Sequence, residues 1–303
     1  MKPNSASGKT SDTIYSLNGR IVPEDAAVVS VTDRGFLYGD GVFETLHAYG
    51  RSVFCLRDHI VRIEAGMRQL HFNPLPNRAD LERWIAAAVD AGNFPEANVR
   101  LTVTRGSGPR GPSIHAGNSP TVVIMATHFQ RPPAARLTQG VRAIYATFRR
   151  QEAAATARLK TLNYIEQILA KREADLAGAD EALLLNNAGL LCEGSASNIA
   201  LIRDGVLALP DPERAGALPG IAQQTAIAAA RKLKIPVQLT SLSPWDPGRS
   251  DEAFLSGSMR EITPLVQVGD ATIGSGKPGP FTLKIVAEYR RIVERQCKPF
   301  KFK

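Results

Sequence analysis

Alternation of apolar and polar residues predicts a series of short β-strands in the first part of the chain. Residues 14–17 and 20–22 are two of these strands, and Asn18-Gly19 between them is a dipeptide that favours a two-residue hairpin turn. Further strands are predicted at 42–47, 52–56, 98–104 and 120–127. The first two of these are expected to pair, and a glycine-rich loop over 106–117 separates the last two.

Apolar residues three and four positions apart predict helices among these strands. Asp58 is the expected cap of a helix that runs to about His71, and Asn77 or Asp80 starts the next one. In the second half of the chain the pattern predicts helices over 163–177, over 221–233 and from about 280, with strands at 141–145, 181–186, 198–203, 237–240 and 252–255. The strands 181–186 and 198–203 are expected to pair.

The best candidate for a linker is 130–135, where Pro132 and Pro133 hold the chain extended. A boundary there predicts a small domain over 13–129, a linker over 130–137 and a larger domain over 138–303. Strands mixed with helices in each half indicate an α+β or mixed α/β fold. Residues 1–12 are rich in Ser, Lys and Thr and lack an apolar stretch, so we expect a flexible extension there and no secretory signal.

Composition is that of a globular protein, since 44% of the 303 residues are hydrophobic and 22% are charged. The apolar runs fall well short of the roughly 18 residues needed to cross a bilayer, so no membrane partner is expected. The three cysteines, Cys55, Cys192 and Cys297, are odd in number and lack the spacing of metal ligands. They indicate free thiols in a reducing cytoplasm and no metal site.

The excess of basic residues does not by itself decide which kind of partner the protein binds. A net charge of +8 and a pI of about 9.6 are compatible with a nucleic acid or with an anionic small molecule. The basic residues are scattered or lie in the tail 298–303, and aromatic residues make up only 6%. This distribution favours a solvated basic surface, so we expect a small-molecule partner and no nucleic acid. Gly8-Lys9-Thr10 is rejected as a phosphate-binding loop, because Pro3 stands where that motif needs glycine.

Four segments carry candidate chemistry. Three glycines within seven residues of the segment 33–45, DRGFLYGDGVFET, indicate either a plain turn or backbone packed closely against a neighbouring chain or a ligand. Lys160 precedes an apolar helix pattern, and Glu193 lies in CEGSASN beside a predicted buried strand, where a carboxylate needs a partner. The helix start at 217–221 and the hydroxyls of Ser256-Gly257-Ser258 are groups that suit a phosphate monoester.

Taken in this order, the segments resemble the fold-type IV family of pyridoxal-phosphate enzymes. That family contains branched-chain and D-amino acid aminotransferases, (R)-selective amine transaminases and aminodeoxychorismate lyase. The resemblance covers about residues 14–293. It implies a two-domain chain with pyridoxal 5′-phosphate in the cleft between the domains, and a homodimer whose partner chain completes the site.

The resemblance also implies a role for individual residues. Lys160 matches the Schiff-base lysine, whose primary amine both forms the internal aldimine and returns as a free base to move a proton. Glu193 matches the glutamate that keeps the pyridine nitrogen protonated, so that the ring acts as an electron sink. Tyr164 falls near a tyrosine that binds the phenolic oxygen, at a spacing one residue shorter than in branched-chain enzymes. The residues implied to hold the phosphate are Arg62, the backbone of Ile221 and Ala222, and Ser258.

Substrate choice is expected to depend on Tyr38, Phe43, Arg100 and Arg110. Arg110 matches the carboxylate-trapping arginine of D-amino acid aminotransferases, but their tyrosine is replaced by Arg100 and their histidine by Pro112. The presence of both Arg100 and Arg110 is more similar to the lyase, whose dicarboxylate substrate would use two arginines. Each arginine either enters the pocket or pairs with a local carboxylate.

The segment 261–264, EITP, and residues 218–221 are instead more similar to branched-chain aminotransferases. We therefore predict a transaminase that moves an amino group between an amino acid or amine and a 2-oxo acid. The alternative is aminodeoxychorismate lyase, which releases pyruvate to form 4-aminobenzoate.

Overall fold

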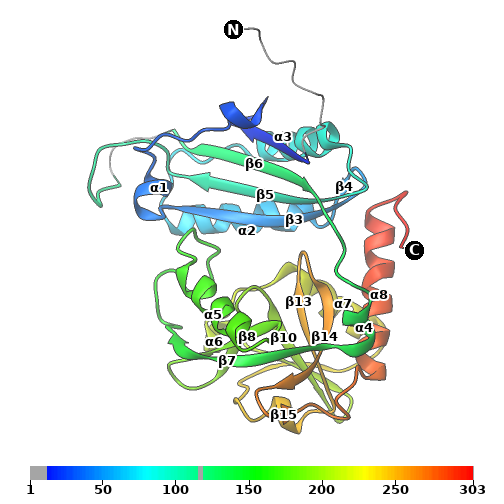
Figure 1. The fold of residues 1–303 in the computed structure, drawn as a ribbon. Helices are drawn as coiled ribbons and strands as arrows, with labels where there is room; N and C mark the ends of the chain where they lie inside the picture. The colour runs from blue at the N-terminus through cyan, green and yellow to red at the C-terminus, as the bar shows by residue number, and fades with distance from the viewer. Residues whose placement is uncertain (1–11, 115–118, 303) are drawn as a thin grey trace, which may run out of the picture.

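The strands of the computed structural model form two sheets, one above the other in Figure 1, and the structure describes residues 12–114 and 119–302. The first sheet has the order β2-β1-β6-β5-β3-β4. Its strands are β1 (Thr13–Leu17), β2 (Arg20–Val22), β3 (Gly41–Tyr49), β4 (Ser52–Val53), β5 (Glu96–Thr104) and β6 (Thr121–His128). The expected extension, apart from Asp12, and the rejected Gly8-Lys9-Thr10 motif lie outside the described residues.

Two helices, α2 (Leu56–Gln69) and α3 (Arg78–Gly92), pack against the first sheet. Alternate residues of β5 and β6 are buried, as the period of a strand requires when one face meets a helix layer. Val99, Leu101 and Ile124 of these strands share one apolar core with Ile60 of α2 and Ile85 of α3. This core holds β3 and α2, which supply several residues of the site described below.

The second sheet has the order β12-β11-β10-β13-β14-β7-β8-β9, with β15 beside β14. Its strands are β7 (Val141–Arg150), β8 (Glu181–Asn186), β9 (Leu191–Gly194), β10 (Asn198–Arg203), β11 (Val206–Pro210), β12 (Val237–Thr240), β13 (Glu252–Gly257), β14 (Glu261–Val268) and β15 (Ala271–Thr272). The helices α7 (Ile221–Lys232) and α8 (Pro280–Gln296) share an apolar core with β10 and β13, whereas α5 (Ile165–Leu176) packs on β7 and β8 through Ala170 and Ala174.

Several predicted elements are confirmed. The Asn18-Gly19 hairpin joins β1 to β2, and both turn residues have the positive φ of a type I′ turn, 50° and 80°. The expected pair of 42–47 with 52–56 is present, although β4 is only two residues long. The start of α2 differs from the prediction, because the helix begins at Leu56, after Cys55 in the left-handed region at φ 51°, and Asp58 lies in its first turn.

The expected pairing of 181–186 with 198–203 is wrong. The chain turns back at Gly189, which has φ 78°, and Leu191–Gly194 forms the extra strand β9. Strand β8 therefore pairs with β7 and β9, and β10 pairs with β11 and β13. Strand β9 was not predicted because its sequence Cys-Glu-Gly lacks an apolar pattern, although Glu193 is buried within the strand.

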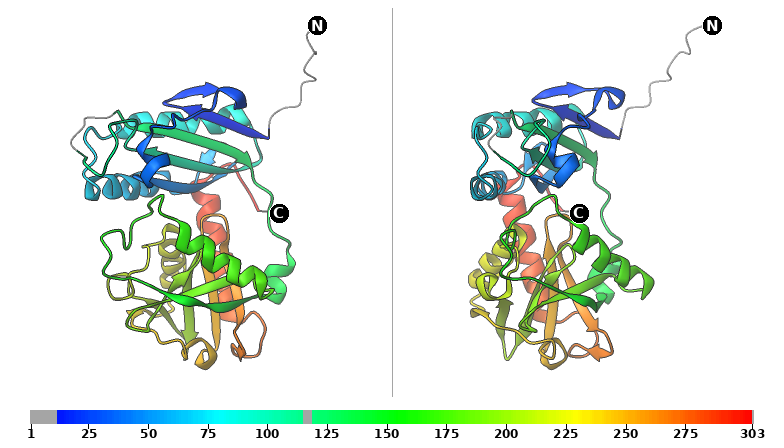
Figure 2. Two further views of the ribbon diagram at one scale, coloured as in Figure 1. Left: turned by 60° about the vertical axis from the view of Figure 1, so that its left-hand side comes forward. Right: turned by 90° about the vertical axis from the view of Figure 1, so that its left-hand side faces the viewer.

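The chain crosses from one sheet to the other over residues 129–140 (Figure 2). The predicted linker overlaps the short helix α4 (Ala135–Gln139), which begins just after the prolines that were expected to keep the chain extended. The division into domains stays a prediction. Short helices are also present at α1 (Arg34–Tyr38) and α6 (Pro212–Ala215). In the described part of the chain, none of the helices has the length and apolar character to cross a membrane.

Candidate active site

A cavity of about 640 Å³ lies between the two sheets, a volume typical of small-molecule sites. Residues from both halves of the chain line it, including nine of the eleven predicted site residues. These are Phe43, Arg62, Arg100, Lys160, Tyr164, Glu193, Ile221, Ala222 and Ser258. The other two, Tyr38 and Arg110, are not among the lining residues.

Backbone contacts with strand β3 fix the position of Lys160. The N–H of Phe43 donates to the Lys160 carbonyl at 2.9 Å, and the N–H of Leu162 donates to the Gly41 carbonyl at 3.0 Å. A Cβ on Gly41 would lie 2.6 Å from Leu162 Cδ1 and 2.7 Å from a backbone oxygen of β5, so only glycine allows this approach. Gly39 and Gly41 therefore lie against Asn163 and Leu162 in the segment that follows Lys160, whereas Gly35 lies against Thr104 of β5. Close backbone packing is thus present at these glycines, and a neighbouring chain or ligand beside them stays a prediction.

The side chain of Lys160 is held in an apolar and aromatic environment. Its Nζ lies 4.6 Å from the centroid of the Phe43 ring and 5.8 Å from that of Tyr164. Burial lowers the pKa of Lys160 to about 8, against an opposing influence from Glu44. About a tenth of the amine is therefore uncharged at pH 7, far more than for an ordinary lysine, as a nucleophilic or basic lysine requires.

Arg62 is oriented by a buried carboxylate of β3. Its Nε and Nη2 each donate to Glu44 at 2.7 Å, and Nη1 donates to the Pro219 carbonyl at 2.9 Å. Glu44 also accepts from Nδ1 of His59 at 2.7 Å. Burial alone would raise the pKa of Glu44, but Arg62 and His59 outweigh it and hold the pKa at about 2. The pair fixes the guanidinium of Arg62 at the cavity wall.

Glu193 is fully enclosed and has two partners. Nη1 of Arg150 donates to one carboxylate oxygen, and the N–H of Leu218 donates to the other at 2.9 Å. Burial raises the pKa of Glu193, while Arg150 and the backbone N–H oppose this effect. Tyr164 lies nearby, where its hydroxyl donates to the Ser195 carbonyl at 3.4 Å and its ring meets Phe43 edge-on.

The N-terminus of α7 faces the same cavity. Among the residues that the structure describes, no side chain caps this helix, so the N–H groups of Ile221 and Ala222 at its positive end are available to an anion. A Cβ on Gly220 would overlap Asn198 Oδ1, which explains the glycine at the cap position. Ser258 lies on the turn between β13 and β14, which a hydrogen bond from Arg260 N to Gly257 O closes at 3.1 Å.

Arg100 of β5 enters the cavity without an acidic partner. Its guanidinium lies 3.9 Å from the centroid of Phe43, on the same ring that Lys160 contacts. Burial lowers the pKa of Arg100, and no carboxylate in the described part of the chain pairs with it. Of the two possibilities left open by the sequence, Arg100 therefore enters the pocket.

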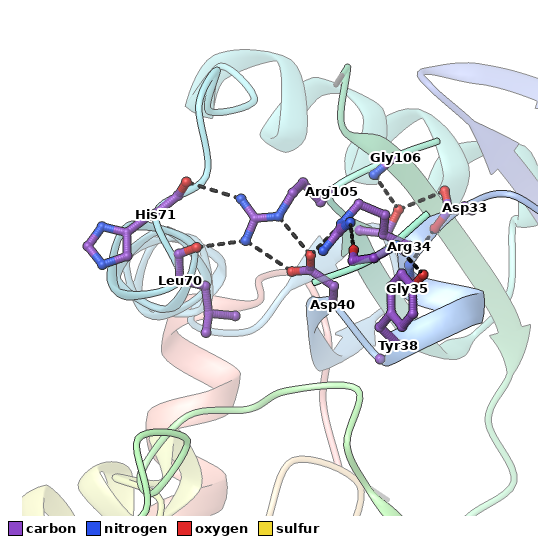
Figure 3. Close-up of polar contacts among 12 residues, drawn as sticks. Asp33, Arg34, Gly35, Tyr38, Asp40, Leu70, His71, Arg105 and Gly106 are labelled. Atoms are coloured by element: carbon purple, nitrogen blue, oxygen red, sulfur yellow. Dashed lines mark hydrogen bonds and ion pairs between the residues drawn. The ribbon is translucent and has the colours of Figure 1, made fainter. Parts of the chain in front are cut away.

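Tyr38 and Arg110 lie at a separate edge, where α1 packs on the loop after β5. The carboxylate of Asp40 accepts hydrogen bonds from Arg34 and from Arg105, each Nε at 2.8 Å (Figure 3). Arg105 also donates to the Leu70 and His71 carbonyls at the end of α2. Here the Tyr38 hydroxyl accepts from Gly111 N at 2.8 Å, and Arg110 is exposed. Tyr38 is thus bonded to the backbone of Gly111, and neither Tyr38 nor Arg110, which precedes Gly111, lines the cavity.

Several cavity residues are absent from the sequence-based prediction. Arg150 and Arg260 line the cavity, and Glu44 and Glu181 hold Arg62 and Arg260 in place. The sequence signal for such partners is a carboxylate in or beside a predicted buried strand; it was drawn for Glu193 and holds equally for Glu181, the first residue of a predicted apolar strand.

Comparison with known proteins agrees with this geometry. The family model for amino-transferase class IV matches residues 41–268. A putative branched-chain-amino-acid aminotransferase of Methanocaldococcus jannaschii is 34% identical over 91% of this chain and 95% of its own length.

Two solved structures are also similar. The branched-chain aminotransferase of the thermophilic archaeon Thermoproteus uzoniensis, solved with norvaline, has a TM-score of 0.85 and 33% identity, covering 94% of this chain and 96% of that one. The 4-amino-4-deoxychorismate lyase of Pseudomonas aeruginosa has a TM-score of 0.82 and 33% identity, covering 91% and 98%. The chain therefore belongs to the class IV aminotransferases, with the fold-type IV architecture that its sequence indicated.

Proposed function

We propose that this chain transfers an amino group between an amino acid and a 2-oxo acid, with Lys160 as the residue that binds pyridoxal 5′-phosphate covalently. Enzymes of this family use that cofactor. The observation that carries the assignment is Lys160 itself, a half-buried lysine that lines the cavity and has a pKa lowered to about 8.

The other cavity residues fit the cofactor. When bound, pyridoxal 5′-phosphate supplies an electron sink for the carbanion formed at the substrate Cα. Arg62, the uncapped start of α7 and the Ser258 hydroxyl present the donors that a phosphate needs. Glu193 presents a carboxylate to the same cavity, and a cationic ring nitrogen beside it would lower the pKa that burial raises.

The Nζ amine of Lys160 would then take the proton from the substrate Cα and return it to the aldehyde carbon of the cofactor. With a pKa of about 8 it can accept a proton at neutral pH and return it. Phe43 and Tyr164 flank this amine. Arg100, an unpaired cation on the Phe43 ring, is placed to hold a substrate carboxylate.

A second copy of the chain is proposed to complete the enzyme. Helix α1 exposes Phe36, which is 72% accessible, and helix α5 exposes Ile165, Ile168 and Leu169 at the spacing of one helix face. Both helices lie on the left-hand side of Figure 1. A second copy covering this face would bury these side chains. Tyr38 and Arg110, which lie at the same edge, would then approach the cavity of the second copy. Light scattering should give twice the chain mass of 32.7 kDa, and F36D with I168D should give the single mass.

A reducing compartment, the cytoplasm, is proposed from the cysteines. In the described part of the chain Cys55, Cys192 and Cys297 are all free thiols, and Cys192 and Cys297 are buried.

The test of function is a half-reaction followed by absorbance. Purified holoenzyme is mixed separately with L-amino acids, D-amino acids, (R)-amines and aminodeoxychorismate, and conversion of the bound cofactor to its pyridoxamine form is recorded. Conversion by an amino acid or amine supports the transaminase and shows its stereochemistry. Pyruvate release from aminodeoxychorismate without conversion would establish the lyase instead.

The covalent role of Lys160 has its own test. Borohydride reduction of the holoenzyme, followed by peptide mass spectrometry, should place the cofactor on Lys160. Lys160→Ala should carry no adduct after reduction, while Lys171→Ala, which changes a surface lysine on α5, should carry it as wild type does. An adduct that persists in the Lys160→Ala variant would refute the assignment.

A further inference from the structure

We propose that Arg260 is a second carboxylate-recognition residue of the cavity, which together with Arg100 adapts it to substrates that carry two carboxylates. The inference rests on the proposed function, because it concerns the substrate of the same site. The carboxylate-binding role that the sequence predicted for Arg110 is thereby given to Arg260. Arg110 does not line the cavity, and Arg260, which does, was not singled out from the sequence.

Arg260 stands on the same tight turn as Ser258. The turn links β13 to β14, and the bond from Arg260 N to Gly257 O closes it at 3.1 Å. Both residues line the cavity. The guanidinium is therefore carried by a short, hydrogen-bonded element, and its backbone has little freedom to move away from a ligand.

Most of the hydrogen-bonding capacity of Arg260 is unused. Its Nη2 donates to Glu181 Oε2 at 3.0 Å, whereas Nη1 is buried and has no acceptor among the described residues. No acceptor for Nε is present in that part of the chain either. A buried donor without a partner is unfavourable, and a planar guanidinium is suited to a carboxylate that can accept two parallel bonds.

Glu181 cannot satisfy the remaining donors of Arg260. This carboxylate is fully buried and already accepts from the N–H groups of Ala182 and Ser195, and from the hydroxyls of Ser195 and Ser197. Its role toward Arg260 is to fix the orientation of the guanidinium through one nitrogen. The Arg260 side chain is 18% exposed, and this accessible part is left for another acceptor, whereas Nη1 itself presents almost no surface to the cavity.

The two arginines approach the cavity from different sheets. Arg100 comes from β5 of the first sheet and lies against Phe43, the ring that also contacts the Lys160 amine. Arg260 comes from the β13–β14 turn of the second sheet. A ligand with one carboxylate satisfies one of these cations, and a ligand with two can satisfy both.

A site built to bind a polar group rejects an analogue that lacks the group, because its own donors are then left unpaired. We therefore expect the cavity to prefer a dicarboxylate over a monocarboxylate of the same length. Since a hydrogen bond to a charged group contributes about 1.5–3 kcal/mol, the preference should be about ten- to hundred-fold in Kd.

The experiment compares two unreactive acids of five carbons, glutarate and pentanoate, by calorimetric titration of the holoenzyme. The quantity measured is the ratio of the pentanoate Kd to the glutarate Kd. The wild type should give a ratio of about ten or more, and Arg260→Met should bring the ratio close to one. Arg100→Met should do the same, because either loss leaves only one carboxylate bound. Arg149→Met, an exposed arginine outside the cavity, controls for the change in net charge and should retain the wild-type ratio.

Arg260 could instead serve only to neutralise Glu181, and the same measurements separate the two roles. A neutralising role predicts a lower unfolding temperature for Arg260→Met with an unchanged ratio, and that result would overturn the proposal. Arg260→Lys keeps the charge beside Glu181 and serves where the methionine variant does not fold. Arg260→Lys should lose at least part of the preference for glutarate, so the same ratio in Arg260→Lys as in the wild type would also refute the proposal. A ratio near one in the wild-type protein itself would refute it as well.

Failure of this inference is distinguishable from failure of the proposed function. The ratio is a binding measurement with ligands that cannot react, whereas the proposed function is tested by cofactor conversion with amino acids. Conversion by L- or D-amino acids together with an unchanged ratio in Arg260→Met would reject the role of Arg260 and leave the aminotransferase in place.

Discussion

Replacing Glu44 by glutamine removes the charge that orients Arg62. Glu44 is fully buried on β3 and accepts three bonds of 2.7 Å, two from Arg62 and one from His59. The amide of glutamine has nearly the same shape, so the cavity left behind is negligible. The change tests the charge of the network and not its packing.

The magnitude follows from the pKa. The pKa of Glu44 falls from 4.5 to about 2, and one pKa unit corresponds to about 1.36 kcal/mol, so the network favours the charged form by roughly 3 kcal/mol. Because the pKa is depressed in the folded state, this stabilisation is fully present above about pH 4.5 and is lost as the pH falls toward 2. Linkage gives a contribution of about 3 kcal/mol at pH 7 and about 1.5 kcal/mol at pH 3.

Urea denaturation of wild type and Glu44→Gln at pH 7 and at pH 3 measures this difference. Glu64→Gln on α2 is the matched control, because Glu64 also binds two arginines, Arg68 and Arg78, but at the surface, where such pairs contribute about 1 kcal/mol or less. The reasoning is refuted if Glu44→Gln costs no more than Glu64→Gln, or if its cost is the same at both pH values. In addition, the apo form of Glu44→Gln should bind pyridoxal 5′-phosphate more weakly, because Arg62 loses its fixed orientation.

Three further predictions concern the same site. The rate at which apoenzyme takes up pyridoxal 5′-phosphate should rise with pH through about 8, as burial lowers the pKa of Lys160 and the free amine is the reactive form; a midpoint near 10 would contradict this. Gly41→Ala should lower the free energy of unfolding by about 1–3 kcal/mol in a denaturant titration, because its Cβ would meet backbone, whereas Gly66→Ala, whose Cβ would lie 3.3 Å from the Val42 side chain, should cost less. Glu193→Gln should retain bound cofactor by absorbance but lose most of its turnover, and wild-type turnover would exclude Glu193 as the partner of the ring nitrogen.

The sequence predicted best those features that depend on neighbouring residues. The hairpin at Asn18-Gly19, the alternating strand β5 and the apolar face of α2 each follow from a short segment. The helix α1 escaped prediction because it lies within 33–45, where glycines and aromatic residues indicate a turn. Its cap is Asp33, which accepts from Gly35 N at 2.7 Å and also binds Thr104 and Thr121, residues far away in the sequence.

The parts of the site that escaped prediction depend on pairs that are distant along the chain. Arg62 lies 18 residues from Glu44, Arg150 lies 43 from Glu193, and Arg260 lies 79 from Glu181. No periodicity connects such residues, since each pairing arises only when elements distant along the chain meet: α2 with β3, β7 with β9, and the β13–β14 turn with β8. The resemblance to a family supplied Lys160, Glu193 and Arg62, but it could not supply Arg260.

These three pairs share one design. In each of them a buried carboxylate holds an arginine at the cavity wall, so that its orientation is set before any ligand arrives. The acid also neutralises much of the charge of its arginine. The arginine therefore acts on a ligand mainly through directional hydrogen bonds and less through general attraction for anions. Arg100 is different, because no carboxylate in the described residues offsets it. Its uncompensated charge therefore fits the role proposed for it toward a substrate carboxylate, whereas Arg62 and Arg260 would give directional hydrogen bonds to the cofactor phosphate and to a second carboxylate.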